Sequence, residues 1–175
     1  FKQKTAYEIP KRDWSSDVCS SDLPDRLALV CEDHSLTFSQ HRQAVAGFAR
    51  RLQEIGVKGE RVVVLMTNCL EMPVCILGAM AAHAYVAPMN PNYSDNEMTP
   101  LLRDTSPKVV VTLPEFRERV GRIAGALGIP HILIAGEGTD VIPNWIEEGT
   151  EGLPRPLPKS EDRSEEHTSE LQSRF

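Results

Sequence analysis

The chain has 175 residues, and its 25 acidic against 19 basic side chains give a net charge of −6 at neutral pH. This length suits one domain, and the acidic balance argues against the basic face of a nucleic-acid-binding protein. The longest apolar run, Val74–Ala82, is too short to cross a bilayer, which needs about 20 apolar residues. A cytoplasmic protein with no nucleic-acid partner and no transmembrane segment is expected.

The first expected elements are a hairpin and a helix. Leu27–Val30 and Leu36–Phe38 are short apolar runs on either side of a turn, which is typical of two paired strands. Thr37 or Ser39 can cap a helix, because apolar side chains then recur at three- and four-residue spacing. Gly56 predicts the end of this helix.

A strand, a helix and a second strand follow. Arg61–Met66 is almost continuously apolar, which predicts a buried parallel strand. Residues 70–82 predict a helix that is apolar on nearly every side, with Pro73 in the first turn, where a missing N–H has little effect. Tyr85–Ala87 predicts a short strand, and the two prolines of Pro88–Asn92 predict an extended loop.

Beyond this loop, a helix, a strand, a helix and a strand are expected in turn. Ser94 with Glu97 three residues later is the capping-box pattern of a helix start. From Gly136 onward, glycine, proline and acidic residues predict a loop with room for one helical turn. The expected ranges are 94–104, Lys108–Thr112, Pro114–Gly128 and His131–Ile134. Alternating strands and helices predict an α/β fold, a partial, mostly parallel sheet with flanking helices.

The groups that could carry chemistry form no recognisable motif. There is no GxGxxG, no P-loop pattern and no GxSxG nucleophile pattern, and no histidine stands at a metal-ligand spacing. His41 is expected at the surface, and His83 is expected to cap the last carbonyl groups of the helix at 70–82. Cys69 and Cys75 are expected to be core thiols. No catalytic, cofactor-binding or metal-ligating residue is therefore assigned.

Both ends of the chain resemble translated sequencing adapter. Residues 13–23 and 163–173 are encoded by DNA strings that are reverse complements of each other over nearly their whole length, and residues 1–9 fit one reading frame of another adapter. Segments of a natural protein have no reason to be related in this way, whereas a DNA insert ligated between identical adapters has to be. The expected organisation is adapter-derived sequence at 1–23 and 163–175 and gene sequence at 24–162.

Five short segments also carry a family resemblance by their order: LTF at Leu36–Phe38, GVKGERV at 56–62, NCLEM at 68–72, AYVAPMNPNY at 84–93 and DTSPKVVVT at 104–112. They are similar to the LTY, GV-GDRV, NxxEF, AxVVPLNPxY and DSxxKVLxT segments of the adenylate-forming superfamily. This superfamily includes acyl-CoA synthetases, luciferases and peptide-synthetase adenylation domains. One position departs from the pattern, because His83 stands where the family usually has glycine.

The resemblance implies the activity of an intact parent enzyme, an ATP-dependent, AMP-forming acyl-CoA synthetase. It would join a fatty or other carboxylic acid to AMP, release pyrophosphate and pass the acyl group to CoA. ATP, Mg²⁺ and CoA are the implied cofactors. The family's phosphate-binding loop and its later catalytic residues would follow Asp162. The fragment alone is therefore expected to be inactive and to bind none of these cofactors tightly.

Two other interpretations stay open. Asn90–Pro91 followed by Tyr93–Ser94 resembles CoA ligases more than peptide-synthetase adenylation domains, which usually read DPxYP at this place. A fragment of such an adenylation domain is nevertheless one alternative, and a carrier domain downstream in the parent would favour it. The other alternative is a non-enzymatic α/β binding module with the same order of elements.

Overall fold

A computed structural model describes residues 23–155 of the chain. The predicted adapter segments, 1–23 and 163–175, lie outside these residues except for Leu23, so their origin stays a prediction. The end of the predicted gene sequence, 156–162, also lies outside them.

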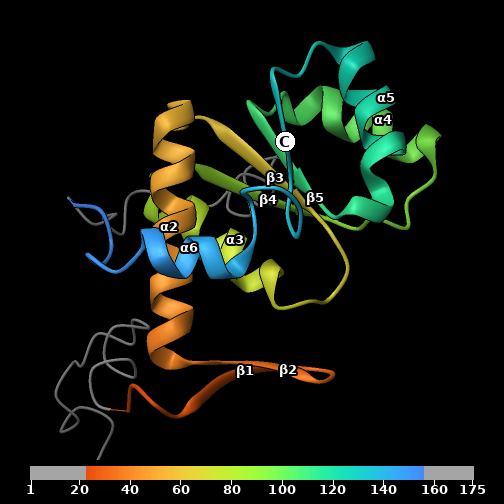
Figure 1. Cartoon of the computed structure of the whole chain (residues 1–175). Helices are drawn as coiled ribbons and strands as arrows, with labels where there is room; N and C mark the ends of the chain where they lie inside the picture. Colours follow the sequence, from red (N-terminus) through yellow and green to blue (C-terminus); the bar gives the residue numbers. More distant parts are fainter. Residues whose placement is uncertain (1–22, 156–175) are drawn as a thin grey trace, which may run out of the picture.

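The centre of the fold is a four-stranded parallel sheet (Figure 1). Its spatial order is β4 (Tyr85–Met89), β3 (Arg61–Leu65), β5 (Val109–Thr112) and β6 (His131–Ile134), and each neighbouring pair is parallel. β3 pairs with β4 on one side and with β5 on the other, so the winding of the chain reverses across β3. This arrangement confirms the predicted α/β class with a mostly parallel sheet.

Helices cover both faces of the sheet. They are α2 (Phe38–Ile55), α3 (Glu71–Ala81), α4 (Asp95–Thr105), α5 (Arg117–Leu127), which follows the 3-10 turn η1 (Pro114–Phe116), and α6 (Ile142–Glu148). Figure 1 shows α4 and α5 together on one side, and α2, α3 and α6 on the other.

The strand sequence divides the core between these two layers. Successive residues of a strand point to opposite faces of a sheet. Val62 and Val64 of β3 accordingly belong to the cluster that contains α2, α3 and α6, whereas Val63 and Leu65 belong to the cluster that contains α4 and α5. Both faces of the central strands are covered, which explains why their sequences are continuously apolar and do not alternate.

A separate hairpin precedes the sheet. β1 (Leu27–Cys31) and β2 (His34–Thr37) are antiparallel, as predicted. The predicted end of the second strand is wrong by one residue, because Phe38 is the first residue of α2. The reason is a capping box at Thr37, whose hydroxyl accepts from the Gln40 N–H at 3.2 Å while the Thr37 N–H donates to the Gln40 side chain at 3.0 Å. This reciprocal pair fixes the helix start earlier than the apolar spacing alone indicates.

The predicted loop at Pro88–Asn92 is wrong for its first two residues, because β4 continues through Pro88 to Met89. β4 lies at the edge of the four-stranded sheet. An edge strand tolerates proline, since a missing N–H on its outer side breaks no ladder hydrogen bond.

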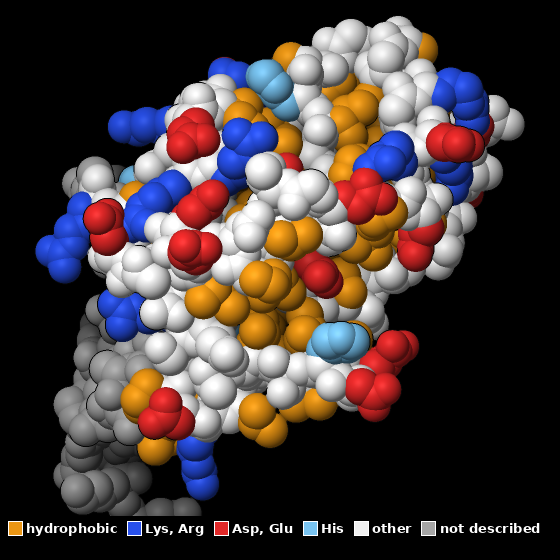
Figure 2. Space-filling view, in the orientation of Figure 1, with side chains coloured by type: hydrophobic (Ala, Val, Ile, Leu, Met, Phe, Trp, Pro, Cys, Tyr) orange, Lys and Arg blue, Asp and Glu red, His pale blue; other side chains and the backbone are white. Residues whose placement is uncertain are grey.

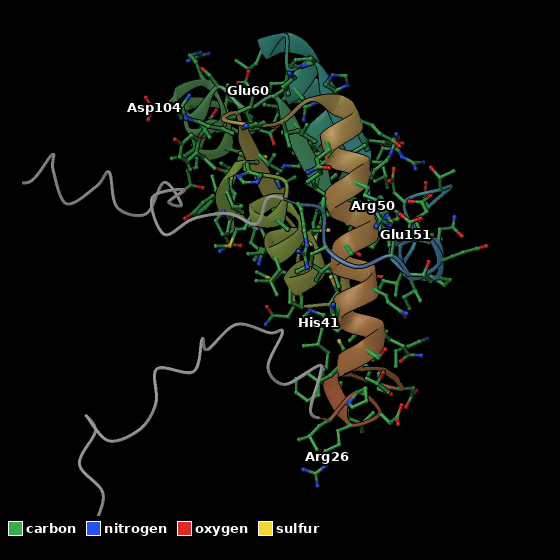
Figure 3. The ribbon with its side chains drawn as sticks, turned by 90° about the vertical axis from the view of Figure 1, so that its left-hand side faces the viewer. Arg26, His41, Arg50, Glu60, Asp104 and Glu151 are labelled. Carbon is green, nitrogen blue, oxygen red and sulfur yellow. The ribbon has the colours of Figure 1, made fainter. Side chains whose placement is uncertain are left out.

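The segment after β6 is more helical than predicted. α6 spans seven residues and packs across α2, with Trp145 buried against Phe48 at a ring-centroid distance of 4.8 Å. Arg50 of α2 binds the C-terminal end of α6. Its guanidinium donates to the carbonyls of Glu148 and Gly152 and pairs with Glu151 at 3.5 Å (Figure 3). Long-range contacts with α2 therefore stabilise a helix that is too short to be stable by itself.

Candidate functional site

The carboxyl ends of the parallel strands are the place to look for a binding site. In open α/β sheets, ligands bind in the crevice outside these ends, close to the strand where the winding reverses. The reversal lies between β3 and β5, and the loops that follow β3, β4 and β5 all emerge at this edge. The Thr112 hydroxyl donates to the Leu65 carbonyl at 2.7 Å, which ties the ends of β5 and β3 together.

A cavity of about 470 Å³, cavity A, lies between the loops after β3 and β4. Its lining residues are Met66, Thr67, Asn68, Met72, Pro88, Met89, Asn90, Pro91 and Asn92. None of these side chains is ionisable. Thr67 and the three asparagines offer amide and hydroxyl groups, and the methionines and prolines offer apolar surface. Cavity A therefore suits an uncharged part of a ligand, because it offers no basic side chain that could pair with a phosphate group.

A second cavity of about 460 Å³, cavity B, lies between the hairpin, the start of α3 and the segment that leads into α6. Its lining residues are Cys31, Glu32, His34, Ser35, Leu36, Cys69, Leu70, Glu71, Gly136, Val141, Ile142 and Pro143. Figure 2 shows hydrophobic side chains gathered in the middle of this face. The walls of cavity B are mostly apolar, and the charged side chains of Glu32 and Glu71 also line it.

The thiols in this region are not poised as nucleophiles. Cys69 is half-buried with its Sγ 3.8 Å from the Met66 sulfur, and burial raises its pKa to about 11. Cys75 is fully buried, and burial raises its pKa well above the ordinary value. Cys75 belongs to the buried core, as predicted, whereas Cys69 is only partly buried and packs against that core.

His41 is not at the surface, and that prediction is wrong. Only 7% of the residue is exposed, and its Nε2 has no hydrogen-bond partner among the described residues. The face of α2 that carries Ala44 and Val45 is buried, and His41 lies one turn before them on the same face. Spacing alone did not show that this face extends to the helix start.

The stability of the chain is expected to fall as the pH drops below the ordinary histidine value of 6.5. Burial lowers the pKa of His41, so the unfolded chain takes up the proton before the folded chain does. Stability is therefore complete above 6.5 and decreases below it, by at most about 1.4 kcal/mol per pH unit. Urea unfolding at about pH 7.5 and about pH 5.5 measures this loss. His41→Phe should reduce the loss, whereas His34→Gln at an exposed position should not; an unchanged loss in His41→Phe would refute the assignment.

His83 lies in the left-handed region, with φ of 61°. Its backbone N–H donates to the Met80 carbonyl at 2.9 Å, and its carbonyl accepts from the Gly59 N–H at 2.8 Å. The main-chain N–H of His83 therefore caps one of the last carbonyl groups of α3, as predicted. The positive φ is a conformation that glycine adopts more readily than histidine, which fits the glycine found at this position in the sequences that the chain resembles.

The other candidate groups are structural. Glu147 and Glu148 are exposed. Gly136 and Gly138 have positive φ values of 92° and 60°, in the part of the predicted loop that precedes α6. Within residues 23–155, no set of three His, Cys, Asp or Glu side chains could hold a metal ion. No helix in the same range is long and apolar enough to span a membrane.

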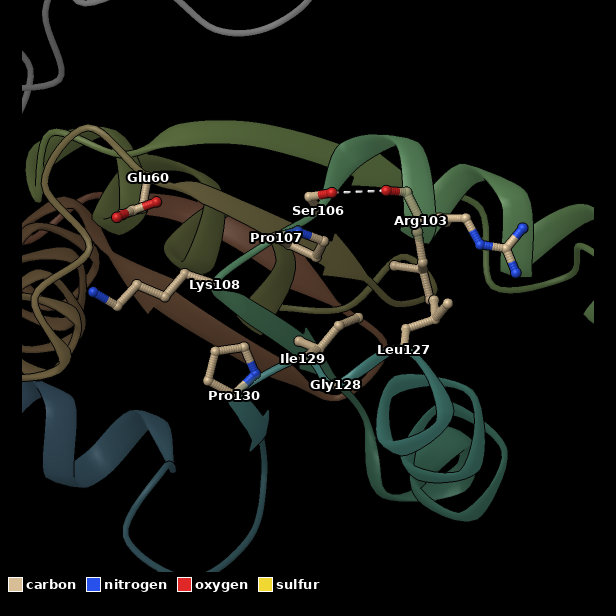
Figure 4. Close-up of a pocket in the computed structure, with 10 residues that line it drawn as sticks. Glu60, Arg103, Ser106, Pro107, Lys108, Leu127, Gly128, Ile129 and Pro130 are labelled. Atoms are coloured by element: carbon tan, nitrogen blue, oxygen red, sulfur yellow. Dashed lines mark hydrogen bonds between the residues drawn. The ribbon is translucent and has the colours of Figure 1, made fainter.

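A third cavity, of about 430 Å³, opens at the opposite edge of the sheet, where β3, β5 and β6 begin (Figure 4). Arg103 and Lys108 extend in opposite directions from it, so their charges do not converge on one point. Lys108 donates to the Gly56 carbonyl at 2.9 Å and Ser106 donates to the Arg103 carbonyl at 2.7 Å. These groups stabilise turns, and this edge is not where ligands bind in such sheets.

Comparison with known sequences gives a family match. A family model described as AMP-binding enzyme matches residues 18–170. A medium/long-chain-fatty-acid–CoA/3-oxocholest-4-en-26-oate–CoA ligase of Mycobacterium marinum is 30% identical over 123 residues, which is 67% of this chain and 22% of that ligase. Bacitracin synthase 2 of Bacillus licheniformis is 31% identical over 98 residues, which is 55% of this chain and 4% of that synthase.

Solved structures share the fold. A long-chain-fatty-acid-CoA ligase from Archaeoglobus fulgidus matches with a TM-score of 0.72 and 19% sequence identity, over 85% of this chain and 32% of the ligase. The chain thus spans a third or less of the length of each of these proteins.

Proposed function

Because this chain belongs to the AMP-binding enzyme family, we propose that it is the N-terminal scaffold of an AMP-forming acyl-CoA synthetase. The whole enzyme would activate a carboxylic acid, a fatty acid in the first instance, with ATP, and then transfer the acyl group to the thiol of CoA. The observation that carries this proposal is the family match over residues 18–170, supported by the sheet shared with the long-chain ligase. Relatives named as fatty-acid–CoA ligases favour this substrate class.

The described residues do not fit the implied ATP, Mg²⁺ or CoA phosphates. Cavity A is uncharged, the basic side chains of the opposite edge diverge, and no metal-binding set of side chains occurs in residues 23–155. We therefore derive no catalytic step from them. The part that this chain would play is to form an uncharged wall of the substrate cleft at the carboxyl edge of its sheet. The free cysteines Cys31, Cys69 and Cys75 suit a cytoplasmic enzyme.

An adenylation domain of a peptide synthetase is the second candidate, because bacitracin synthase 2 also matches. The two functions differ in the acceptor of the acyl group. The full-length enzyme should therefore be assayed with fatty acids and, separately, with amino acids, each with ATP and Mg²⁺ and with either CoA or a carrier protein as acceptor. We expect AMP, pyrophosphate and acyl-CoA. Transfer to the carrier thiol alone would establish the second candidate, and acid-independent or absent AMP formation would refute both.

We also propose that residues 1–23 and 163–175 derive from ligated adapter and that 24–162 is gene sequence. The complementarity of the two coding strings supports this division. The family match extends six residues into the first segment (18–23) and eight into the second (163–170), so the native DNA has to be read across both junctions. Adapter codons present in the native locus would contradict the proposal.

A further inference from the structure

The loop Asn90–Tyr93 leads from β4 toward α4, and its residues Asn90, Pro91 and Asn92 form one wall of cavity A. The loop is a tight turn: the Asn90 side chain accepts from the Asn92 N–H at 2.9 Å, and the Asn90 carbonyl accepts from the Tyr93 N–H at 3.4 Å. Ser94 follows at once as the cap of α4, in the predicted capping box with Glu97. These local bonds bend the chain but attach it to nothing outside the loop.

Arg119 of α5 supplies that attachment. Its Nε lies 2.7 Å from Asp95 Oδ1, its Nη1 donates to the Pro91 carbonyl at 3.0 Å, and its Nη2 donates to the Tyr93 carbonyl. One guanidinium thus holds the loop at two carbonyls and the first residue of α4 at its carboxylate. Its side chain is 29% exposed, so these bonds are partly shielded from water.

Asp95 orients the guanidinium. Its second oxygen pairs with Arg122 at 2.6 Å, so the carboxylate is bound from both sides. Hydrogen bonds from Arg119 and then Arg122 hold the pKa of Asp95 below its ordinary value. Arg122 binds Asp95 but neither of the two loop carbonyls, whereas Arg119 binds Asp95 and both of them.

Only the geometry of arginine meets this requirement. Its guanidinium is a rigid planar fork with five N–H donors, whereas the ammonium of lysine is a compact point charge. Lysine at position 119 could keep the charge pair with Asp95, but it could not span Asp95 and both loop carbonyls together.

We propose that Arg119 is a positioning residue that fixes the Asn90–Tyr93 loop and thereby the shape of cavity A. The ligand that this wall would contact is the uncharged part of the carboxylic acid substrate, an identity that rests on the proposed function. The positioning of the loop does not depend on that identity. Arg119 touches no reacting atom and acts through the loop.

Hydrogen exchange of the 175-residue chain tests the positioning directly. In Arg119→Lys we expect the amides of Asn92, Tyr93 and Ser94 to exchange about tenfold faster, the factor that corresponds to losing bonds to a charged donor worth about 1.4 kcal/mol. The amides of α2 should keep their protection. Arg122→Lys is the matched control, and it should leave loop exchange within about twofold of the wild type.

Three results would overturn the proposal. One is unchanged loop exchange in Arg119→Lys, and another is an equal increase in Arg122→Lys. The third is a uniform loss of protection across the sheet, which would make Arg119 a residue of general stability.

Steady-state kinetics of the full-length enzyme test the role of Arg119 separately from the proposed function. Arg119→Lys should raise KM for the acid about tenfold with little change in kcat, and Arg122→Lys should change neither. A loss of folded enzyme would instead lower the apparent kcat at constant KM, and this result would contradict a role at cavity A. If the wild-type enzyme forms no acid-dependent AMP, the proposed function fails, while the exchange experiment still decides whether Arg119 holds the loop.

Discussion

Replacement of Trp145 by alanine is expected to lower the free energy of unfolding by about 3–5 kcal/mol, the usual range for a large buried aromatic side chain. Trp145 is 1% exposed and is among the largest fully buried side chains of the described residues. It packs against Phe48 with the rings tilted by 55°. The change removes the main contact between α6 and α2 and leaves a cavity in the core.

Urea unfolding of the chain measures this effect. Glu147→Ala, on the exposed side of the same helix, is the matched control and should change stability by less than about 0.5 kcal/mol. Trp145→Phe should cost less than Trp145→Ala, because phenylalanine leaves a smaller cavity, and neither change loses a hydrogen bond of the indole N–H among the described residues. Equal stability of Trp145→Ala and Glu147→Ala would contradict the packing of α6 on α2.

Gly47→Ala is expected to be the second strongly destabilising change, by about 1–3 kcal/mol or more. α2 and α6 cross so closely at this point that a methyl group on Gly47 would overlap the backbone carbonyl of Trp145. The obstructing atom belongs to the main chain, so no side-chain rotation can relieve the overlap. The effect should appear even though alanine is a better helix former than glycine.

Gly121→Ala gives the matched control, because Gly121 lies inside α5 and no atom would lie within 4 Å of the added methyl group. This change should stabilise the chain by about 0.5–1 kcal/mol, since it removes conformational freedom from the unfolded chain. Thermal unfolding of both variants, followed by circular dichroism, compares them. A similar shift of the midpoint in both variants would show that α2 and α6 do not meet at Gly47.

The sequence was informative wherever a feature depends on near neighbours. Continuous valine runs predicted the buried strands, and Gly56 and Gly128 end α2 and α5 with φ values of 78° and 69°. These glycines were identified because a left-handed residue at a helix end favours glycine for local steric reasons. The capping box at Ser94 and Glu97 was found for the same reason.

Features that depend on distant partners were missed or wrong. α6 is stabilised by α2, about a hundred residues earlier, through Arg50 and Trp145. His41 is buried because the buried face of α2 extends to its first turns. Pro88 belongs to β4 because that strand lies at an edge, which only the sheet order reveals. Arg119 carried no sequence signal, since its partners lie on another loop and helix.

If the chain is only a scaffold, the groups that activate the carboxylate lie outside its 175 residues. Acid-dependent exchange between ATP and labelled pyrophosphate should be measured with the purified 175-residue chain, Mg²⁺ and a panel of fatty acids, beside the full-length enzyme under the same conditions. The scaffold role predicts exchange by the full-length enzyme and only the blank level for the chain. Exchange by the chain above the blank would contradict it, because the groups that activate the carboxylate would then lie within these residues.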